Sequence, residues 1–327
     1  MRIVVIGGSG HIGTYLSPRL VQAGNEVLSV SRGQREPYRD HPAWRQITRI
    51  TIDRAAENSA ERIAGLRADA VVDLTCYTLE SARQLVDSLR GRVGHFLHCG
   101  TIWVHGHSVF VPTTEDAPRQ PFGDYGCRKA TIEAYLLQEA RERGFPATVL
   151  HPGHLVGPGW FPINPIGNFN PEVFERLGAG VEVCLPNLGM ETVHHVHCDD
   201  VALAFERALV ARDRAVGESF HVVSAAAMTL RGYAESMADW FGQPARLRFL
   251  PWEEWRVGFS EKDAAATWDH IAHSPNCSIE KARSLLGYEP RFSGIAAVQE
   301  SVEWLIENGK IRIKRADFRP RVSVSGS

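Results

Sequence analysis

The sequence predicts an α/β protein in which helices pack on both faces of a parallel sheet, with a smaller C-terminal lobe of α+β structure. Three observations support this. An apolar run at residues 2–6 breaks into glycines and continues as a helical pattern. Apolar runs of strand length then alternate with helical patterns as far as residue 150, which is typical of a doubly wound sheet. After residue 158 the chain becomes rich in proline, glycine and asparagine, which indicates a change of architecture.

The N-terminal strand is aliphatic on both faces, as a buried parallel strand requires, and the segment Gly7-Gly8-Ser9-Gly10-His11-Ile12-Gly13 follows it. Gly7 and Gly10 allow a sharp turn and a close approach to a ligand, and Gly13 allows the next helix to lie tightly on the sheet. The free amides at that helix start favour an anion, typically a pyrophosphate. The alternative is a plain strand–turn–helix whose glycines only relieve steric crowding.

The remaining elements follow from hydrophobic periodicity. We expect strands at residues 26–31, 47–52, 68–74, 94–98, 146–150, 193–197, 220–223 and 246–250, and helices at 11–23, 79–89, 171–177, 201–210, 230–241, 278–285 and 294–307. These elements predict a dinucleotide-binding, Rossmann-type domain over residues 1–158, to which residues 192–224 return. A substrate-binding lobe is expected over 159–191 and 225–315, with a polar and poorly ordered tail at 316–327.

The end of the second strand predicts which dinucleotide binds. An acidic residue there would hydrogen-bond the 2′-hydroxyl of the adenosine ribose, whereas this chain has Ser31 and Arg32. A guanidinium beside a hydroxyl suits a phosphomonoester, so NADP(H) is favoured over NAD(H). Alternatively, Arg32 is a solvated loop arginine. Asp53 and Arg54 follow the third strand, where Asp53 is expected to meet the adenine amino group.

A candidate acid/base pair lies further along. Tyr125 and Lys129 are four residues apart on a predicted helix and therefore share one face. A neighbouring ammonium favours the phenolate, so Lys129 is expected to lower the pKa of Tyr125 and to hold the nicotinamide ribose. Thr101 lies just past the fifth strand, where its hydroxyl would hydrogen-bond a substrate oxygen. This set predicts hydride transfer between a secondary carbinol and a carbonyl.

The chain resembles the extended short-chain dehydrogenases/reductases, grouped as the NAD-dependent epimerase/dehydratase family. Matching segments run in order over nearly the whole chain: Gly7, Gly10 and Gly13; Thr101 to Gly106; Thr114-Glu115-Asp116 through Pro121; Tyr125, Lys129 and Glu133; Pro152 with Val156-Gly157-Pro158; Val196 to Val201; Ser278 to Ala282; and Leu286 to Pro290. The resemblance implies an enzyme that binds a dinucleotide in the first lobe and a small-molecule substrate in the second. It also implies a homodimer formed through the two helices that flank the active site.

These considerations define the candidate site. Residues expected at the cofactor are Gly7, Ser9, Gly10, His11, Ile12, Gly13, Ser31, Arg32, Asp53, Arg54, Leu74, Thr75, Cys76, Lys129, His151, Gly153 and His154. Residues expected at the substrate are Tyr77, Trp103, His105, His154, Asn168, Asn170 and His195. No metal site is expected, because the histidines have no acidic or cysteine partner at a fixed spacing. Trp103 could equally serve in packing between the lobes.

Three departures from the family pattern bear on the substrate. His151 stands where the family often has an arginine, the Arg-Pro-Gly-Asp segment of nucleotide-sugar members is missing from the C-terminal lobe, and Ile102-Trp103 replaces the acidic pair of sugar 4,6-dehydratases. Dehydration is therefore not expected. A sugar or nucleotide-sugar epimerase is the first hypothesis, and an NADPH-dependent reductase or dehydrogenase of a small polar substrate is the alternative.

Composition excludes other classes. The net charge of -2 argues against bulk attraction to nucleic acid or anionic membranes, and no apolar run approaches the length of a membrane span. The six cysteines are expected to be free thiols in the cytoplasm. Asp53-Arg54 and Val71-Val72-Asp73 also resemble the plant chloroplast stem-loop RNA-binding proteins of this superfamily. A non-catalytic nucleotide- or RNA-binding protein is therefore a minor alternative.

Overall fold

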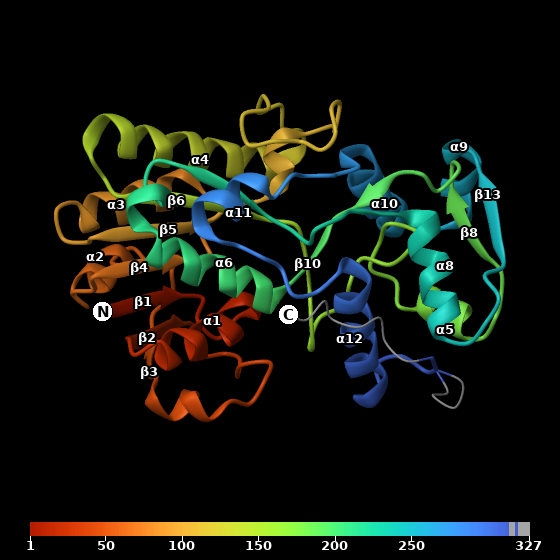
Figure 1. The fold of residues 1–327 in the computed structure, drawn as a ribbon, viewed down its shortest axis with the longest axis horizontal. Helices are drawn as coiled ribbons and strands as arrows, with labels where there is room; N and C mark the ends of the chain where they lie inside the picture. The colour runs from red at the N-terminus through yellow and green to blue at the C-terminus, as the bar shows by residue number, and fades with distance from the viewer. Residues whose placement is uncertain (314–317, 320–327) are drawn as a thin grey trace.

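The computed structural model describes residues 1–313 and 318–319, and a seven-stranded parallel sheet forms its larger part (Figure 1). The strand order is β11-β6-β5-β4-β1-β2-β3, which confirms the predicted doubly wound α/β fold. The strands are β1 (Arg2–Ile6), β2 (Glu26–Ser31), β3 (Thr48–Thr51), β4 (Ala70–Asp73), β5 (His95–Cys99), β6 (Ala147–Pro152) and β11 (Ser219–Val222).

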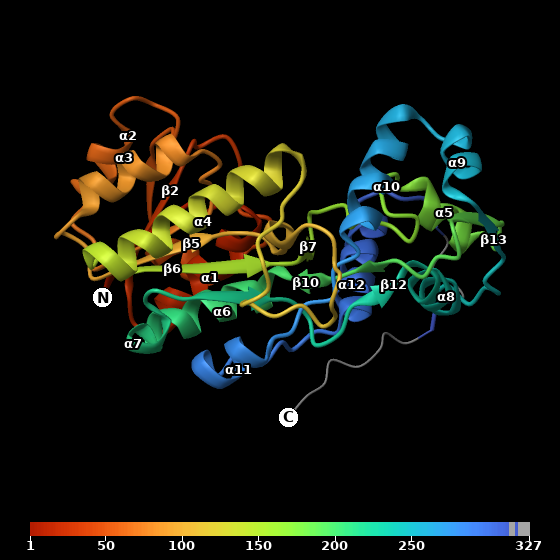
Figure 2. The ribbon, with the colours of Figure 1, turned by 90° about the horizontal axis from the view of Figure 1, so that it is seen from above.

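Helices cover both faces of this sheet (Figure 2). Alternate residues of β1 face opposite cores, with Ile3 and Val5 on one side and Val4 and Ile6 on the other. The first core includes α1 (His11–Gln22), α6 (Cys198–Val210) and α11 (Glu280–Leu286), and the second includes α2 (Ser59–Ala64), α3 (Leu79–Leu89) and α4 (Gly123–Arg143). Burial on both faces explains why β1 and β4 consist almost entirely of aliphatic residues.

The C-terminal lobe has a separate hydrophobic core that includes Phe174, Tyr233, Trp240 and Trp255. In Figure 1 the lobe lies beside the sheet domain, at the carboxyl ends of its strands. Its helices are α5 (Glu172–Gly178), α8 (Leu230–Trp240), α9 (Trp252–Trp255), α10 (Glu261–His273) and α12 (Gly294–Glu307). Short strand pairs complete it and join the lobes: β8 (Val183–Pro186) with β13 (Leu247–Leu250), β9 (Thr192–Val193) with β12 (Met228–Thr229), and β7 (His154–Val156) with β10 (His195–His197).

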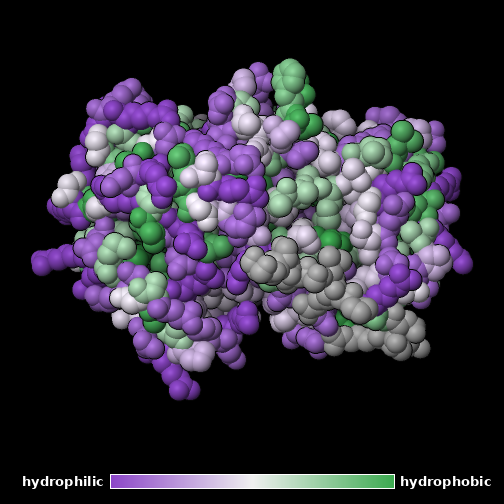
Figure 3. All heavy atoms as spheres, viewed as in Figure 1, coloured by the Kyte–Doolittle hydropathy of each residue, from purple (hydrophilic) through white to green (hydrophobic). Residues whose placement is uncertain are grey.

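The remaining short elements are single helical turns. They are η1 (Pro42–Gln46), η2 (Ile102–His105), α7 (Arg212–Ala215) and η3 (Arg256–Gly258). A loop between η2 and α4 carries exposed hydrophobic side chains at Val109, Phe110 and Val111. Figure 3 shows hydrophobic side chains protruding from the otherwise largely hydrophilic outline near this part of the molecule. Within the described part of the chain, no helix has the length and apolar character needed to cross a membrane.

The structure differs from the sequence-based elements in several places. The strand expected at 193–197 is two strands, β9 and β10, and the short elements α2, α9, β7, β8 and β12 were not predicted. Helix α10 was not predicted. Residues 277–288, expected in the C-terminal lobe, contribute Ile279 and Tyr288 to the core beneath the sheet. Most of the predicted tail lies outside the described residues, but its Phe318 ring packs 4.8 Å from that of Trp240.

Candidate active site

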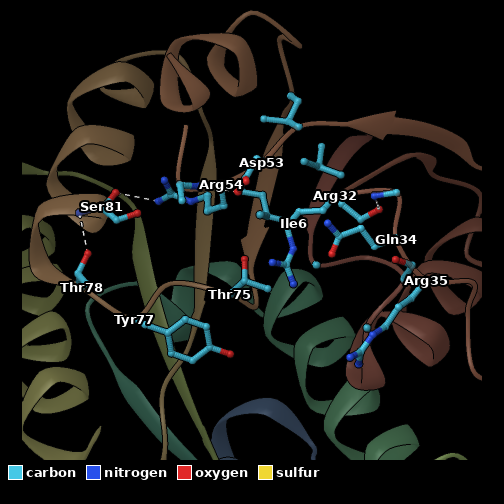
Figure 4. A pocket seen from close by; sticks show the side chains of 18 of the residues that line it. Ile6, Arg32, Gln34, Arg35, Asp53, Arg54, Thr75, Tyr77, Thr78 and Ser81 are labelled. Carbon is cyan, nitrogen blue, oxygen red and sulfur yellow. Dashed lines mark hydrogen bonds between the residues drawn. The ribbon is translucent and has the colours of Figure 1, made fainter. Parts of the chain in front are cut away.

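A cavity of about 700 Å³ opens at the carboxyl ends of β1, β2, β3 and β4 (Figure 4). This is where ligands bind in doubly wound folds. Residues predicted for the cofactor line it from four separate segments: Gly7, Ser9 and Gly10; Ser31 and Arg32; Asp53 and Arg54; and Thr75. The sequence did not identify Gln34, Arg35, Tyr38, Ser81 and Gln84, which line the same cavity from loops and from α3. The volume of the cavity is large enough to hold a large part of a dinucleotide.

The glycines of the loop after β1 allow neighbouring backbone and side-chain atoms to approach closely. Gly7 has a φ of +85°, and a Cβ there would lie 2.6 Å from Thr75 Cγ2. A Cβ at Gly13 would lie 2.5 Å from the backbone of both Gly7 and Gly8, so only glycine lets α1 pack this tightly. The N-cap of α1 is Gly10, and no side chain caps the helix. The first-turn amides are therefore left for an anion, and this donor set fits the pyrophosphate of a dinucleotide.

The adenosine end of the cavity contains arginines in different states. Arg54 is held by Asp73 Oδ2 at 3.3 Å and by the Ser81 carbonyl at 2.8 Å. Arg32 makes no hydrogen bond or ion pair with any described residue. Arg35 donates to the Tyr38 hydroxyl at 3.1 Å. Arg32 and Arg35 both reach the cavity, whereas Arg54 is committed to the protein (Figure 4).

Two smaller contacts organise the same end of the cavity. Ser31 Oγ accepts from the Gly33 amide at 3.2 Å, and Asp53 Oδ1 accepts from the Ala55 amide at 3.0 Å. The Asp53 carboxylate therefore accepts a hydrogen bond within the turn that it begins, at the wall of the cavity. Its expected hydrogen bond to an adenine amino group stays a prediction.

Helix α4 presents Tyr125 and Lys129 one turn apart, with Lys129 buried and Tyr125 44% exposed. Lys129 Nζ donates to the carbonyls of Cys76 (2.8 Å) and Cys99 (2.7 Å). It also lies 4.9 Å from the centre of the Tyr77 ring. The ammonium is therefore fixed between the ends of β4 and β5. Burial lowers the pKa of Lys129, and the neighbouring thiols of Cys99 and Cys76 partly oppose this.

The expected lowering of the Tyr125 pKa is wrong for this structure. Burial raises the pKa of Tyr125, the Cys99 and Tyr77 side chains raise it further, and a hydrogen bond with the Thr101 side chain lowers it only in part. Lys129 is not among the groups that lower the pKa of Tyr125 in this structure. The phenol is thus protonated near neutral pH and lies beside the Thr101 side chain.

Thr101 begins the short helix η2. Its Oγ1 accepts from the Trp103 amide at 3.3 Å, and its own amide donates to His151 Nδ1 at 2.9 Å. Thr101 therefore joins the end of β5 to Tyr125 through its side chain and to β6 through its backbone. Tyr125 thus lies beside Thr101 and shares the neighbours Cys99 and Tyr77 with Lys129, and the catalytic roles of the three residues stay a prediction.

Beyond Tyr125 lies an aromatic cluster that we define as Trp103, His154, His195, His270 and His273. The Trp103 ring lies 6.0 Å from that of Tyr125 and stacks on His273 at 4.1 Å. Trp103 Nε1 donates to His154 Nε2 at 3.3 Å. Burial lowers the pKa of His273 to about 4 and that of His195 to about 3, so these imidazoles are neutral near pH 7. His270 and His273 come from α10, which the sequence did not predict.

Several predicted substrate residues do not face this region. His105 is buried, with its Nε2 2.8 Å from that of His221. Asn168 is buried and donates to Thr267 Oγ1, while Asn170 Oδ1 accepts the Glu172 amide at the start of α5. Both asparagines therefore shape the loop before α5; Asn168 is fully buried here, and the expected contact of Asn170 with substrate stays a prediction. Tyr77 is exposed on the lining of the cofactor cavity, and its expected contact with substrate stays a prediction.

Other predicted cofactor residues serve the framework. His151 is fully buried between Thr101 and Glu133, because Nε2 pairs with Glu133 Oε1 at 2.8 Å. The His11 side chain packs against Tyr38 and Trp160, with Nδ1 3.2 Å from Cys198 Sγ. The remaining ones pack in the interior or against neighbouring backbone rather than line the cavity: Ile12, Leu74, Cys76 and Gly153. All six cysteines are free thiols. Among the described residues, no group of three or more potential ligands could hold a metal ion.

Comparison with known proteins gives one family. A family model described as the NAD dependent epimerase/dehydratase family matches residues 3–223. A chloroplast stem-loop binding protein of 41 kDa from Arabidopsis thaliana is 25% identical, covering 97% of this chain and 82% of its own length. A 2′-dehydrokanamycin reductase from Streptomyces kanamyceticus is 24% identical, covering 95% and 86%.

Solved structures agree on the fold. A UDP-glucose 4-epimerase from Thermotoga maritima, solved with UDP-glucose, has a TM-score of 0.72 and 23% identity over 94% of this chain and 99% of its own. A dTDP-glucose 4,6-dehydratase from Streptomyces venezuelae has a TM-score of 0.71 and 21% identity, covering 94% and 98%. Since the family model spans more than half of its residues, the chain belongs to the NAD dependent epimerase/dehydratase family.

Proposed function

We propose that this protein is an NADP(H)-dependent enzyme that transfers a hydride at a secondary carbinol or carbonyl carbon of an uncharged, hydroxylated ring. The observation that carries the proposal is that the Tyr125 phenol lies beside the Thr101 side chain, with Lys129 one turn further along the same helix. A phenol and a hydroxyl that meet at one point can both contact one substrate oxygen. This arrangement suits proton transfer at that oxygen.

Each residue has a defined role in this proposal. Tyr125 donates its proton to a carbonyl oxygen in reduction, or takes the carbinol proton in oxidation. Thr101 hydrogen-bonds the same oxygen and holds it in place. Lys129, anchored by two carbonyls, has one remaining proton on Nζ for a ribose hydroxyl. The bound dinucleotide supplies or accepts the hydride.

The preference for NADP(H) rests on Arg32 and Arg35. Both reach the cavity beyond β2, and Arg32 has no partner among the described residues. A 2′-phosphate offers charge-assisted hydrogen bonds to such guanidinium groups. Arg54 does not serve this purpose, because it is bound to Asp73 and Ser81.

The substrate class follows from the aromatic cluster. Since Trp103 donates to His154 Nε2, the proton of neutral His154 is on Nδ1. His195 Nε2 lies 3.2 Å from the Ile163 carbonyl and must donate to it, so its Nδ1 is an acceptor. Both Nδ1 atoms are buried without a partner, and the two residues are paired in register between β7 and β10. One donor beside one acceptor suits a hydroxyl group better than a phosphate, although both residues lie outside the cavity lining and substrate would reach them only after the cluster moves.

This argument favours a net reductase or dehydrogenase, in line with the similarity to a 2′-dehydrokanamycin reductase. A sugar or nucleotide-sugar epimerase is the other enzymatic candidate, supported by the fold neighbours. The two differ in cofactor use: a reductase consumes NADPH in proportion to the carbonyl reduced, whereas an epimerase retains its cofactor and gives no net absorbance change at 340 nm.

We also propose the homodimer that the family resemblance implies.

Tyr125→Phe tests the proposal. We expect turnover to fall by about 10²- to 10⁴-fold, because the variant cannot transfer the proton. Its affinity for NADPH should be unchanged. Tyr135→Phe is the matched control, since Tyr135 lies on the same helix, where its ring contacts Arg83. Equal turnover in wild type and Tyr125→Phe would refute the proposed chemistry.

A binding function is the second candidate, favoured by the similarity to a chloroplast stem-loop binding protein over nearly the whole chain. Titration of the protein with a labelled RNA stem-loop at two salt concentrations distinguishes it. Salt-sensitive, tight binding combined with no turnover of carbonyl substrates would favour this candidate over the enzyme.

A further inference from the structure

A buried polar chain ends at the backbone of Thr101. Arg119 donates to both carboxylate oxygens of Glu133, from Nε at 3.0 Å and from Nη2 at 2.7 Å. Glu133 Oε1 also pairs with His151 Nε2 at 2.8 Å. On the other side of the ring, the Thr101 amide donates to His151 Nδ1 at 2.9 Å. Both ring nitrogens of this fully buried histidine therefore have partners.

The chain has one consistent arrangement of protons. Because the Thr101 amide donates to Nδ1, that nitrogen carries no proton, and the proton on Nε2 points to Glu133. Burial alone would raise the pKa of Glu133, but His151 and Arg119 lower it well below its usual range. The ionised carboxylate thus accepts from both partners and fixes the tautomer and the orientation of the ring.

Gly100 gives independent support for the contact between His151 Nδ1 and the Thr101 amide. A Cβ at Gly100 would lie 2.3 Å from His151 Nδ1 and 2.7 Å from Cε1. Any other residue at this position would push the ring away from the Thr101 amide. The glycine after β5 therefore admits the imidazole to the turn that begins η2.

We propose that His151 is a positioning residue, which holds the Thr101 amide so that the Thr101 hydroxyl meets Tyr125. The effect on catalysis rests on the proposed function, whereas the effect on the Thr101 amide does not. His151 is fully buried and both of its ring nitrogens are bonded to protein groups, so it acts through Thr101 without touching cofactor or substrate. Arg119 and Glu133 keep the ring in register.

Two substitutions separate the two sides of the ring. The side-chain oxygen of Asn reaches about as far as Nδ1, so His151→Asn retains an acceptor for the Thr101 amide and loses the contact with Glu133. The amide nitrogen of Gln reaches about as far as Nε2, so His151→Gln retains the contact with Glu133 and loses the acceptor. His95→Gln is the control, because His95 is a buried histidine at the opposite end of β5, bonded to Thr148 Oγ1 at 2.9 Å.

Amide exchange of [¹⁵N]threonine-labelled protein reads the contact directly. We expect the Thr101 amide to exchange at least about tenfold faster in His151→Gln than in wild type, and His151→Asn to stay within about threefold of wild type. The control should leave this amide unchanged. Should His151→Gln not fold, Glu133→Leu carries the same expectation, because it removes the acceptor that holds His151 Nε2. Equal exchange in the wild type and in a folded ring-releasing variant would overturn the proposal.

Kinetics test the catalytic consequence. In His151→Gln we expect kcat to fall at least about tenfold, with NADPH affinity unchanged, and His151→Asn should recover most of kcat. Equal kcat values for the Gln variant and wild type would overturn the positioning role. If wild type turns over no carbonyl substrate, the proposed function fails, while the exchange result still decides whether His151 holds Thr101.

Discussion

Replacing Arg32 by alanine should change the cofactor preference. Arg32 reaches the cavity without a partner among the described residues, so it has no internal interaction to lose. A charge-assisted hydrogen bond contributes about 1.5 to 3 kcal/mol, and the exposed position of Arg32 indicates the lower end of this range. The affinity for NADPH should then fall about tenfold. The affinity for NADH should stay within about twofold, because the lost contact is made only to the 2′-phosphate.

Titration of NADPH and NADH by fluorescence, at low and moderate salt, measures both constants. The difference between wild type and Arg32→Ala should shrink at higher salt, as ions screen the exposed charge. Arg49→Ala is the matched control: it removes an equal charge nearby, but Arg49 pairs with Glu36 at 2.6 Å and does not line the cavity. An unchanged ratio of NADPH to NADH affinity in Arg32→Ala would show that the 2′-phosphate assignment is wrong.

Three further predictions concern the glycine loop, the histidines and the adenosine site. Gly13→Ala places a Cβ 2.5 Å from backbone atoms of Gly7 and Gly8, so thermal denaturation should show a loss of about 1–3 kcal/mol, whereas Gly258→Ala, which has no neighbour within 4 Å, should change little. Burial lowers the pKa of His11, His194 and His273 to about 4, so each binds its proton more readily when unfolded. The free energy of unfolding in urea should therefore be intact above pH 6.5 and decline toward pH 4, by about 2 kcal/mol per histidine at pH 5; a flat profile would contradict this. Arg35→Ala combined with Arg32→Ala should weaken NADPH binding further than either change alone, unless Arg35 serves only Tyr38.

The sheet could be predicted because buried parallel strands are aliphatic on both faces. Ile3 to Ile6 alternate between two cores and leave no ambiguity about the strand. Helix α10 could not be found in this way, because its buried face carries Thr267, His270 and His273 beside a single buried aliphatic residue, Ile271. A helix is predicted from apolar residues that recur every three to four positions, and polar residues on the buried face interrupt that pattern.

In the candidate site, too, some residues could be predicted from the sequence and others could not. Thr101, Tyr125 and Lys129 could be proposed from the sequence because the resemblance of the segments around them to the family supported a tyrosine–lysine spacing that is weak evidence by itself. The role of His151 could not be proposed, since its partners Thr101 and Glu133 are distant in sequence and meet only through packing. Gly100 was the available signal, because a glycine that directly follows a buried strand can indicate close approach by another group.

Transfer of deuterium from [4-²H]NADPH to an uncharged cyclic ketopolyol tests the central claim most directly. Wild-type protein and Tyr125→Phe would be incubated with a panel of such ketones, and the products analysed by mass spectrometry. We predict that the wild type places one deuterium on the new carbinol carbon of at least one member and that Tyr125→Phe places at least about a hundredfold less. Tight NADPH binding without label in any product, or equal label from both proteins, would contradict hydride transfer at this site.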